Sequence, residues 1–299
     1  MSTPAVTARI GMRERLVAYV MLTKPRIIEL LLVTTVPTMV VAERGLPDLW
    51  LVVATLIGGT LAAGSANVFN CYLDQDIDQM MHRTERRPLA RHQVPPANAL
   101  RFGVVLGVAS FTWLAVTVNL LSAALGVAAI LFYVFVYTML LKRRTSQNIV
   151  IGGAAGCMPV LIGWTAVTGE LALAPWFLFA IVYYWTPPHF WALAVKYRDD
   201  YARAGVPMLP VVRGVEDTTR QILLYTVIMV AVTLMFGPIG GMGLIYLVAS
   251  LVLGGLFIAM AVQLYRQKTE EAAMRLFRFS ISYLGLLFVA MAVDAVVNA

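Results

Sequence analysis

The sequence has few charged residues. Asp, Glu, Lys and Arg make up 13% of its 299 residues and hydrophobic residues make up 60%, whereas about a quarter of a typical soluble domain is charged. So little charge excludes a soluble domain of ordinary composition. We therefore expect a protein that lies within a lipid bilayer.

Cysteine and histidine are also scarce, with two and three residues. Cys71 and Cys157 fall in or beside apolar runs, so they provide no disulfide framework and are expected to be small buried residues. The first 26 residues lack the apolar core and cleavage site of a secretory signal. Their basic character resembles a short mitochondrial presequence, but the first apolar run starts so early that we prefer the inner membrane of a prokaryotic cell.

Long apolar runs occupy most of the chain. A helix needs about 20 apolar residues to cross the hydrocarbon core of a bilayer. Nine such runs cover about residues 27–44, 50–69, 99–117, 120–140, 148–167, 173–194, 221–239, 243–264 and 279–297. The expected fold class is all-α: one integral-membrane domain over residues 1–299, a polytopic bundle of nine transmembrane helices, with polar motifs at about 67–89 and 186–212.

Basic residues predict the orientation of the bundle. All of the 23 Lys and Arg residues except Arg44 fall in the N-terminal segment or in connections on the same side. Because Lys and Arg collect on the cytoplasmic side of membranes, we expect a cytoplasmic N-terminus and an outside C-terminus. Topology thus explains the net charge of +7, which gives no reason to expect nucleic acid, although a basic face suits a polyanionic ligand.

Polar residues recur at a fixed spacing after the second apolar run. Asn70, Asp74 and Asp78 are four residues apart, so they lie on one face of a helix, whereas Asp76 points elsewhere. Clustered carboxylates repel one another unless a cation lies between them, and Mg²⁺ binds carboxylates together with phosphate oxygens and water. The pattern predicts a Mg²⁺ site, and the alternative is a set of solvated carboxylates that pair with nearby arginines.

The same residues carry a family resemblance. Asn70, Asp74 and Asp78, followed by RTERRPL at 83–89, resemble the first aspartate-rich motif of the UbiA superfamily of intramembrane prenyltransferases. The resemblance implies a UbiA-type fold and a Mg²⁺-dependent enzyme that binds an isoprenyl diphosphate through the metal. Cys71 stands where the superfamily usually has Asp, so coordination by this motif is expected from Asn70, Asp74 and Asp78 alone.

A second motif lies four spans further along, which suggests a duplicated bundle. It reads TPPHFWALAVKYRDDYARAGVPMLPVV over residues 186–212. Most of the superfamily has aspartates four residues apart here, and the comparable positions are Tyr197 and Tyr201. The resemblance therefore implies a second metal site built from the intervening Asp199 and Asp200.

The second motif differs from the usual pattern in its Pro-His-Phe segment, its Tyr-flanked Asp pair and the segment AGVPMLP. In these features it resembles one branch of the superfamily, the protohaem IX farnesyltransferases or haem O synthases. Segments 22–27 (LTKPRI), 83–89 and 141–164 fit the same branch. The resemblance covers about residues 20–215 through motifs and the last three spans through hydropathy only. It implies that farnesyl diphosphate and protohaem IX (haem b) are the substrates, that water adds at the 2-vinyl group to give haem O, and that a haem A synthase acts downstream.

The resemblance also implies roles for basic, aromatic and imidazole groups. The residues expected to contact the diphosphate or the substrates are Arg26, Arg83, Arg87, Lys142, Tyr137, Tyr197 and Tyr201. Each basic residue has an alternative role as a topology signal at the headgroups, which we prefer for Arg143 and Arg144. Rings that would stabilise a carbocation, or anchor spans at the interface, belong to Tyr133, Tyr137, Trp164, Tyr184 and Trp185.

His189 lies in the apolar sixth run, in the segment TPPHFW. One hypothesis is that it binds or orients the haem iron, or positions the water that quenches the product cation. The alternative is a hydrogen-bonded structural histidine beside two prolines.

Other functions remain open from sequence alone. A related prenyltransferase would use another aromatic acceptor, such as a hydroxybenzoate or a quinone precursor. A divalent-cation transporter would also place acidic residues on helices, but its path should carry polar groups through the midplane, and here the charges lie at one face. A non-catalytic assembly factor would not need two acidic motifs.

Overall fold

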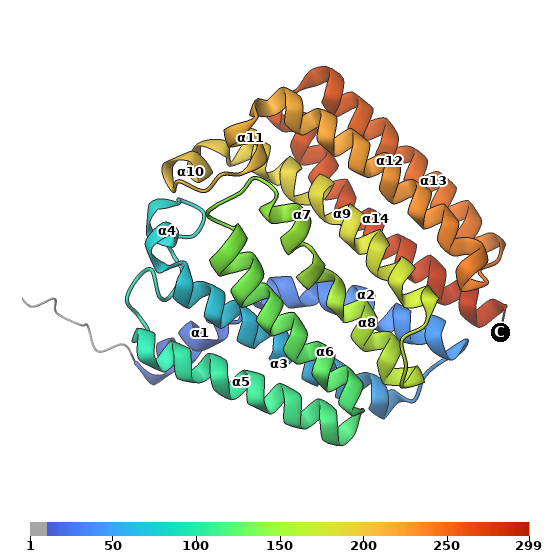
Figure 1. Cartoon of the computed structure of the whole chain (residues 1–299), viewed down its shortest axis with the longest axis horizontal. Coiled ribbons are helices and arrows are strands. Elements are labelled where there is room, and N and C mark those ends of the chain that lie inside the picture. Colours follow the sequence, from blue (N-terminus) through green and yellow to red (C-terminus); the bar gives the residue numbers. More distant parts are fainter. Residues whose placement is uncertain (1–10, 299) are drawn as a thin grey trace, which may run out of the picture.

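The computed structural model describes residues 11–298, apart from the side chains of residues 26–32, and these residues form helices joined by short connections (Figure 1). The long helices are α2 (Pro25–Glu43), α3 (Leu49–Leu73), α5 (Pro96–Thr117), α6 (Leu120–Leu131) with its π-helical continuation η1 (Phe132–Leu141), α8 (Ala154–Thr168), α9 (Leu173–Lys196), α12 (Gly214–Gly240), α13 (Leu244–Gln267) and α14 (Glu270–Val297). The short helices are α1 (Met12–Leu22), α4 (Gln75–Met80), α7 (Asn148–Gly152), α10 (Arg198–Arg203) and α11 (Leu209–Val212).

The prediction of an all-α membrane bundle is confirmed, and each predicted run coincides with a helix. Within the described residues, seven helical segments are long and apolar enough to span a membrane: 49–73, 96–117, 120–141, 148–168, 214–240, 244–267 and 270–297. The predicted count of nine also includes α2, which contributes a shorter apolar helix over Val33–Glu43, and α9, whose Tyr, Trp, Pro and His residues lower its hydropathy. The chain is a multi-pass membrane protein.

Small residues let α3 pack closely on its neighbours. Gly58 lies so near Leu114 of α5 that a Cβ would overlap the leucine side chain. The hydroxyls of Ser65 and Ser110 cross the same interface and donate to the backbone oxygens of Gly103 and Gly58, at 2.8 Å each. In lipid, small residues and interhelical hydrogen bonds take over the role that apolar burial has in water. The α3–α5 pair is therefore a rigid wall of the bundle.

The two halves of the bundle meet along α2, α8 and α9. α9 packs on α12 and α14, while α2 packs on α8, α3 and α14. In Figure 1 the short helices α4 and α10 lie side by side at one end of the bundle, although more than a hundred residues separate them in the sequence. Both polar motifs are thereby brought to the same end.

At the opposite end, Arg44 and Asp294 hold helix termini. Arg44 donates to the backbone oxygens of Gly240 and Gly241 at 2.6 and 3.0 Å, at the C-terminus of α12. Asp294 of α14 accepts from the backbone N–H groups of Gly243 and Tyr246 at 2.5 and 3.1 Å, at the start of α13. A helix end has unsatisfied backbone groups, so these two side chains act as caps from another helix.

We expect Asp294→Ala to lower the free energy of unfolding by about 1–3 kcal/mol for each backbone donor left unsatisfied, because Asp294 is fully buried. The midpoint of thermal unfolding in detergent measures the loss. The matched control is Asp48→Ala, which removes an exposed cap of α3 that binds Leu51 N–H at 3.0 Å. An equal or smaller loss for Asp294→Ala would contradict the capping role.

Candidate active site

The first motif lies at a break between two helices. α3 ends at Leu73, Asp74 has φ −98° and ψ 9°, and α4 begins at Gln75. The backbone bonds Asp74 N to Asn70 O (3.0 Å) and Asp78 N to Asp74 O (2.8 Å) preserve the four-residue spacing through the break. Asn70, Asp74 and Asp78 are each no more than 2% exposed, so the predicted stripe faces inward.

The remaining aspartate of this region, Asp76, faces away from Asn70, Asp74 and Asp78. Its side chain is 61% exposed. Two hydrogen bonds from Arg143, at 2.6 and 2.7 Å, hold it and lower the pKa of its carboxyl group. Arg143 therefore binds the outward Asp76 and also lies 3.7 Å from Asp74 Oδ1, but it is not among the described residues that line the cavity.

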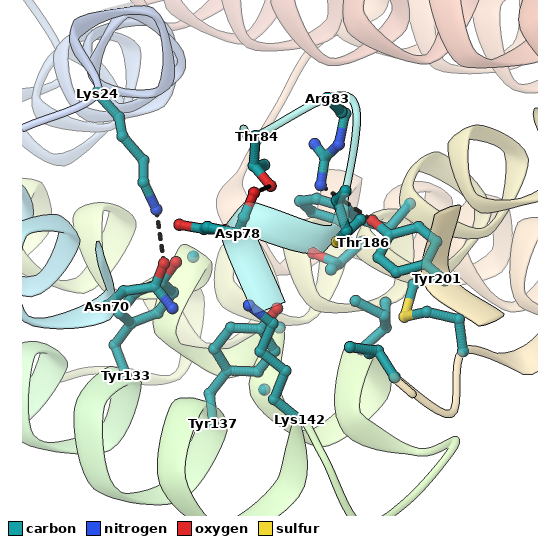
Figure 2. A pocket seen from close by; sticks show the side chains of 18 of the residues that line it. Lys24, Asn70, Asp78, Arg83, Thr84, Tyr133, Tyr137, Lys142, Thr186 and Tyr201 are labelled. Atoms are coloured by element: carbon teal, nitrogen blue, oxygen red, sulfur yellow. Dashed lines mark hydrogen bonds between the residues drawn. The ribbon is translucent and has the colours of Figure 1, made fainter. Parts of the chain in front are cut away.

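Each inward residue of the motif contacts a cation from another part of the chain. Lys24 Nζ donates to Asn70 Oδ1 at 2.6 Å (Figure 2), Lys142 forms an ion pair with Asp74, and Arg87 Nη1 lies 2.8 Å from both oxygens of Asp78. Burial lowers the pKa of Lys24 to about 8, so its amine is mainly protonated at neutral pH. The result is a compact cluster of alternating charges.

Lys24 lines the cavity. The sequence predicted it only as part of the basic N-terminal segment. It precedes α2 with a left-handed backbone, φ 53°, a conformation that a non-glycine residue seldom adopts. This turn sends its side chain into the bundle. The segment LTKPRI pointed to the region, but nothing in it indicated the direction of the lysine.

One carboxylate oxygen in the cluster accepts no hydrogen bond from the described residues. Asp74 Oδ1 is buried and has no hydrogen-bond partner among the described residues, and the guanidinium of Arg143 lies 3.7 Å away. A buried carboxylate oxygen without a partner is costly unless a proton donor or a cation binds it. Within the described part of the chain, no three His, Cys, Asp or Glu side chains converge as a metal cluster, so a metal here would use Asp74, Asp78 and the Asn70 amide oxygen.

The π-helix η1 supplies the opposite wall. Its wide turns continue to the backbone bond from Lys142 N to Tyr137 O (2.8 Å), five residues apart, and the Thr138 hydroxyl donates to Tyr133 O at 2.9 Å. Thr138 also accepts a hydrogen bond from Asn70 Nδ2 at 3.1 Å. This spacing places Tyr133, Tyr137 and Lys142 along one side of the site (Figure 2). π-turns are often found at functional sites.

The second motif repeats the backbone of the first. α9 ends at Lys196, Tyr197 has φ −101° and ψ 23°, and α10 follows at once. The equivalent bonds are Tyr197 N to Leu193 O (3.2 Å) and Tyr201 N to Tyr197 O (3.1 Å). Tyr197 therefore occupies the position of Asp74, and Tyr201 that of Asp78.

The two aspartates of the second motif lie in different environments. The side chain of Asp199 is 88% exposed and pairs with Arg198 at 3.4 Å. Asp200 is buried, binds Arg203 at 2.5 Å and accepts from the backbone N–H of Arg83 at 3.4 Å. Neither is among the described residues that line the cavity, so their predicted role in binding a second metal stays a prediction.

Arg83 connects the two motifs. Its Nη2 lies 3.2 Å from the hydroxyl of Tyr201, and its guanidinium carbon lies 5.8 Å from the ring centroids of both Tyr197 and Tyr201. These distances fit cation–π contacts. His82 and Arg203, 2.9 Å apart, add a further contact between the connections.

A cavity of about 230 Å³ lies between these groups (Figure 2). Its polar end is formed by Lys24, Asn70, Asp78, Arg83, Arg87 and Lys142. Its apolar body is formed by Ile149, Val182, Trp185, Phe190 and Leu284 among others. A second, apolar cavity of about 120 Å³ lies between α3, α6 and α8, and Tyr133 and Gly156 line both cavities.

Two other predicted site residues are His189, which does not line the cavity, and Arg26, whose side chain lies outside the described residues. His189 stacks between Trp185 and Phe277, with ring centroids at 4.3 and 4.6 Å, and its Nδ1 lies 2.7 Å from Ser280 Oγ. It is not among the described residues that line the cavity, which fits the structural alternative, and its role toward haem stays a prediction. The side chain of Arg26 lies outside the described residues.

Three of the five aromatic residues predicted to stabilise a carbocation line the cavity, and two do not. Tyr133, Tyr137 and Trp185 line the cavity. Tyr184 contacts Tyr183 and Tyr225 instead, with ring centroids at 5.4 and 6.1 Å, and Trp164 packs against the main core cluster. Only the first three are placed to meet a substrate in this cavity.

A membrane bundle that encloses a cavity with a cationic and carboxylate-bearing end and an apolar body suits an amphiphile with a polyanionic head. Intramembrane prenyltransferases are one class of proteins with such a site. The model of the UbiA prenyltransferase family matches residues 31–286. The chain belongs to this family.

Curated relatives are similar over nearly the whole chain. "Protoheme IX farnesyltransferase" of Nocardioides sp. (strain JS614) is 56% identical over 296 residues, which are 97% of this chain and 94% of that protein. The protein of the same name from Frankia alni is 57% identical over 289 residues, 96% of this chain and 100% of that protein. The resemblance predicted from the motifs is confirmed.

Solved structures share the fold at low identity. A digeranylgeranylglyceryl phosphate synthase has a TM-score of 0.78 and 18% identity, over 95% of this chain and 99% of that one. A UbiA homologue from Archaeoglobus fulgidus, bound to DMAPP and Mg²⁺, has a TM-score of 0.65 and 16% identity, over 94% and 99%. These neighbours confirm the predicted UbiA-type fold.

Proposed function

We propose that this chain transfers a farnesyl group from farnesyl diphosphate to the 2-vinyl group of protohaem IX, with addition of water, to give haem O and diphosphate. The observation that carries the proposal is the identity of 56–57% with proteins named protoheme IX farnesyltransferase over nearly their full lengths. The cavity adds a chemical reason, since its cationic end and apolar body match the two ends of a prenyl diphosphate.

The difficult step is cleavage of the bond between farnesyl C1 and the diphosphate oxygen. The electron pair leaves with the diphosphate, positive charge grows on C1, and the vinyl group attacks to form the new carbon–carbon bond. Water then adds at the remaining cationic carbon and loses a proton. Fixed positive charges aimed at the leaving group stabilise this transition state, and Lys24, Lys142, Arg83 and Arg87 are placed to do so.

The first motif is suited to hold Mg²⁺, because Asp74, Asp78 and Asn70 are buried oxygen-bearing residues on one face, and Asp74 Oδ1 accepts no hydrogen bond from the described residues. When bound, the ion would act as a Lewis acid toward the leaving diphosphate. Lys142 and Lys24 contact the same residues and are positioned to reach phosphate oxygens beside the metal.

The apolar body of the cavity would hold the farnesyl chain and exclude water until the vinyl group attacks. Tyr133, Tyr137 and Trp185 present ring atoms to this space, where a π face stabilises a carbocation. The second cavity continues from Tyr133 and Gly156 between small residues such as Ala63. We infer that the far end of the chain extends into it.

We expect Ala63→Leu to lower kcat/KM for farnesyl diphosphate by about tenfold, the effect of a few methylene groups in an apolar pocket. Geranyl diphosphate, one isoprene unit shorter, should lose less. Competition between the two diphosphates measures the ratio. The control is Ala124→Leu on the exposed side of α6, and an unchanged ratio in Ala63→Leu would place the chain end elsewhere.

The proposed function is tested by chromatography and mass spectrometry of haem after incubation of the purified protein with haem b, farnesyl diphosphate and Mg²⁺. Haem O should form, and excess chelator should prevent it. A prenylated hydroxybenzoate, formed when that acceptor replaces haem b, would favour the related enzyme. Uptake of Mg²⁺ into liposomes without a prenylated product would favour a transporter.

The same proposal includes a location. With 22–27, 83–89 and 141–144 on the basic side, the diphosphate site faces the cytoplasm of a cell with the chain in its inner membrane. Haem O formed there would be passed to a haem A synthase.

A further inference from the structure

The two motifs have the same backbone but opposite chemistry at equivalent positions. In the first, the residues at the break and four later are Asp74 and Asp78. In the second they are Tyr197 and Tyr201, set by matching turns and hydrogen bonds. A phenol is a poor ligand for Mg²⁺, which prefers carboxylate and phosphate oxygens. The fold therefore repeats the backbone frame of the first motif, and this second frame carries phenols where the first carries carboxylates.

The nearby carboxylates do not replace them. The side chain of Asp199 is 88% exposed. Asp200 is held by Arg203 and the backbone of Arg83, and among the described residues that line the cavity neither aspartate is found. The first motif differs, because Asn70 and Asp78 line the cavity. Asp74 lies between them in the sequence, is not among the described lining residues, and has an oxygen that accepts no hydrogen bond and lies 3.7 Å from Arg143.

A cation already lies in the second frame. The guanidinium of Arg83 contacts the hydroxyl of Tyr201 at 3.2 Å and lies 5.8 Å from both tyrosine rings, and Arg83 lines the cavity. Two phenol rings suit a guanidinium, which binds π faces, whereas carboxylates in their place would suit a divalent ion. The backbone N–H of Arg83 donates to Asp200 Oδ2 at 3.4 Å and so holds the backbone from which this side chain extends.

The charge of the cavity favours the same arrangement. Among the described residues, the cations Lys24, Arg83, Arg87 and Lys142 line the cavity, against the carboxylates of Asp74 and Asp78. The site is already positive before a metal binds, so each added ion is repelled by the others unless the diphosphate offsets it. One divalent ion leaves less uncompensated charge than two.

We propose that Arg83 is the second cation of this active site and takes the place of a second Mg²⁺, so that the chain binds one divalent ion together with its diphosphate. This inference rests on the proposed function, since it assigns the groups that meet the diphosphate. Arg83 would donate N–H groups to phosphate oxygens from the Tyr197–Tyr201 side, opposite the metal at Asp74.

The test counts ions. Mn²⁺ replaces Mg²⁺, inorganic pyrophosphate is the probe, and electron paramagnetic resonance with equilibrium dialysis measures bound Mn²⁺ per full-length chain in detergent. We expect one ion in the wild-type protein at saturating pyrophosphate. Two ions would overturn this inference alone, whereas no bound ion would contradict the metal site of the proposed function.

Two variants test whether Arg83 determines the number of bound Mn²⁺ ions. The triple variant Arg83→Met, Tyr197→Asp, Tyr201→Asp should bind two Mn²⁺ ions, because it restores carboxylates to the second frame. If the triple variant does not fold, the single variant Arg83→Met tests the proposal. It should still bind one Mn²⁺ ion, while its affinity for pyrophosphate should fall by about 10- to 100-fold, the effect of one charge-assisted hydrogen bond. Unchanged affinity in Arg83→Met would overturn the assignment.

Discussion

Asp74→Asn should reduce the formation of haem O by about 10²- to 10³-fold or more, the loss seen when one group that stabilises developing charge is removed. Asp74 is fully buried, pairs with Lys142, and has a second oxygen that accepts no hydrogen bond from the described residues and lies 3.7 Å from Arg143. The amide preserves the shape but removes the charge that would attract the metal and hold the lysine. The rate of haem O formation, with Mn²⁺ binding as a second readout, measures the loss.

The matched control is Asp76→Asn, two residues further along the same connection. Its side chain is 61% exposed and pairs only with Arg143 among the described ionisable residues, so activity should remain within about twofold of the wild type, as for most surface substitutions. Product that persists in Asp74→Asn, or is lost equally in Asp76→Asn, would remove the inward stripe from the mechanism.

Arg87→Met should have the second largest effect. Arg87 holds both oxygens of Asp78 at 2.8 Å, and the Asp78 side chain is 3% exposed. Removing one partner of a buried ion pair costs about 3–5 kcal/mol, and here the diphosphate also loses a cationic contact. We expect farnesyl transfer to fall by about 10²-fold and the unfolding temperature to decrease.

Two further variants distinguish the specific contact between Arg87 and Asp78 from the general positive charge of this connection. Arg86→Met removes a neighbouring arginine that is exposed, and it should leave both readouts unchanged. Arg87→Lys keeps the charge but not the two-point contact, so it should recover thermal stability more than activity. Equal losses for Arg86→Met and Arg87→Met would mean that the general basic charge of the connection matters rather than the contact with Asp78.

The sequence predicted the bundle and the inward stripe because both follow from local spacing. Apolar runs of membrane length become helices, and residues four apart stay on one face, as Asn70, Asp74 and Asp78 do. The break at Asp74 does not disturb this face, since the bonds from 70 to 74 and from 74 to 78 continue through it. Asp76 was likewise expected to point away.

The remaining parts of the site depend on contacts between distant segments. Lys24 enters the site through a left-handed residue before α2, which its sequence does not indicate. Asp199 and Asp200 are neighbours, but successive helical residues point about 100° apart, so one is exposed and the other is buried. Which of them turns inward is set by the packing of α10 against the connection that carries Arg83.

The wide turns of η1 make the length of this segment important for the position of Lys142. Between Phe132 and Leu141 the hydrogen bonds skip one residue more than in an α-helix. Deleting a single residue before Lys142 without a change in the helix pitch would rotate Lys142 by roughly 80–100°, so that it would turn away from Asp74. Exposed apolar residues of this stretch, such as Phe135 and Met139, should tolerate apolar substitutions, whereas a one-residue deletion should not be tolerated.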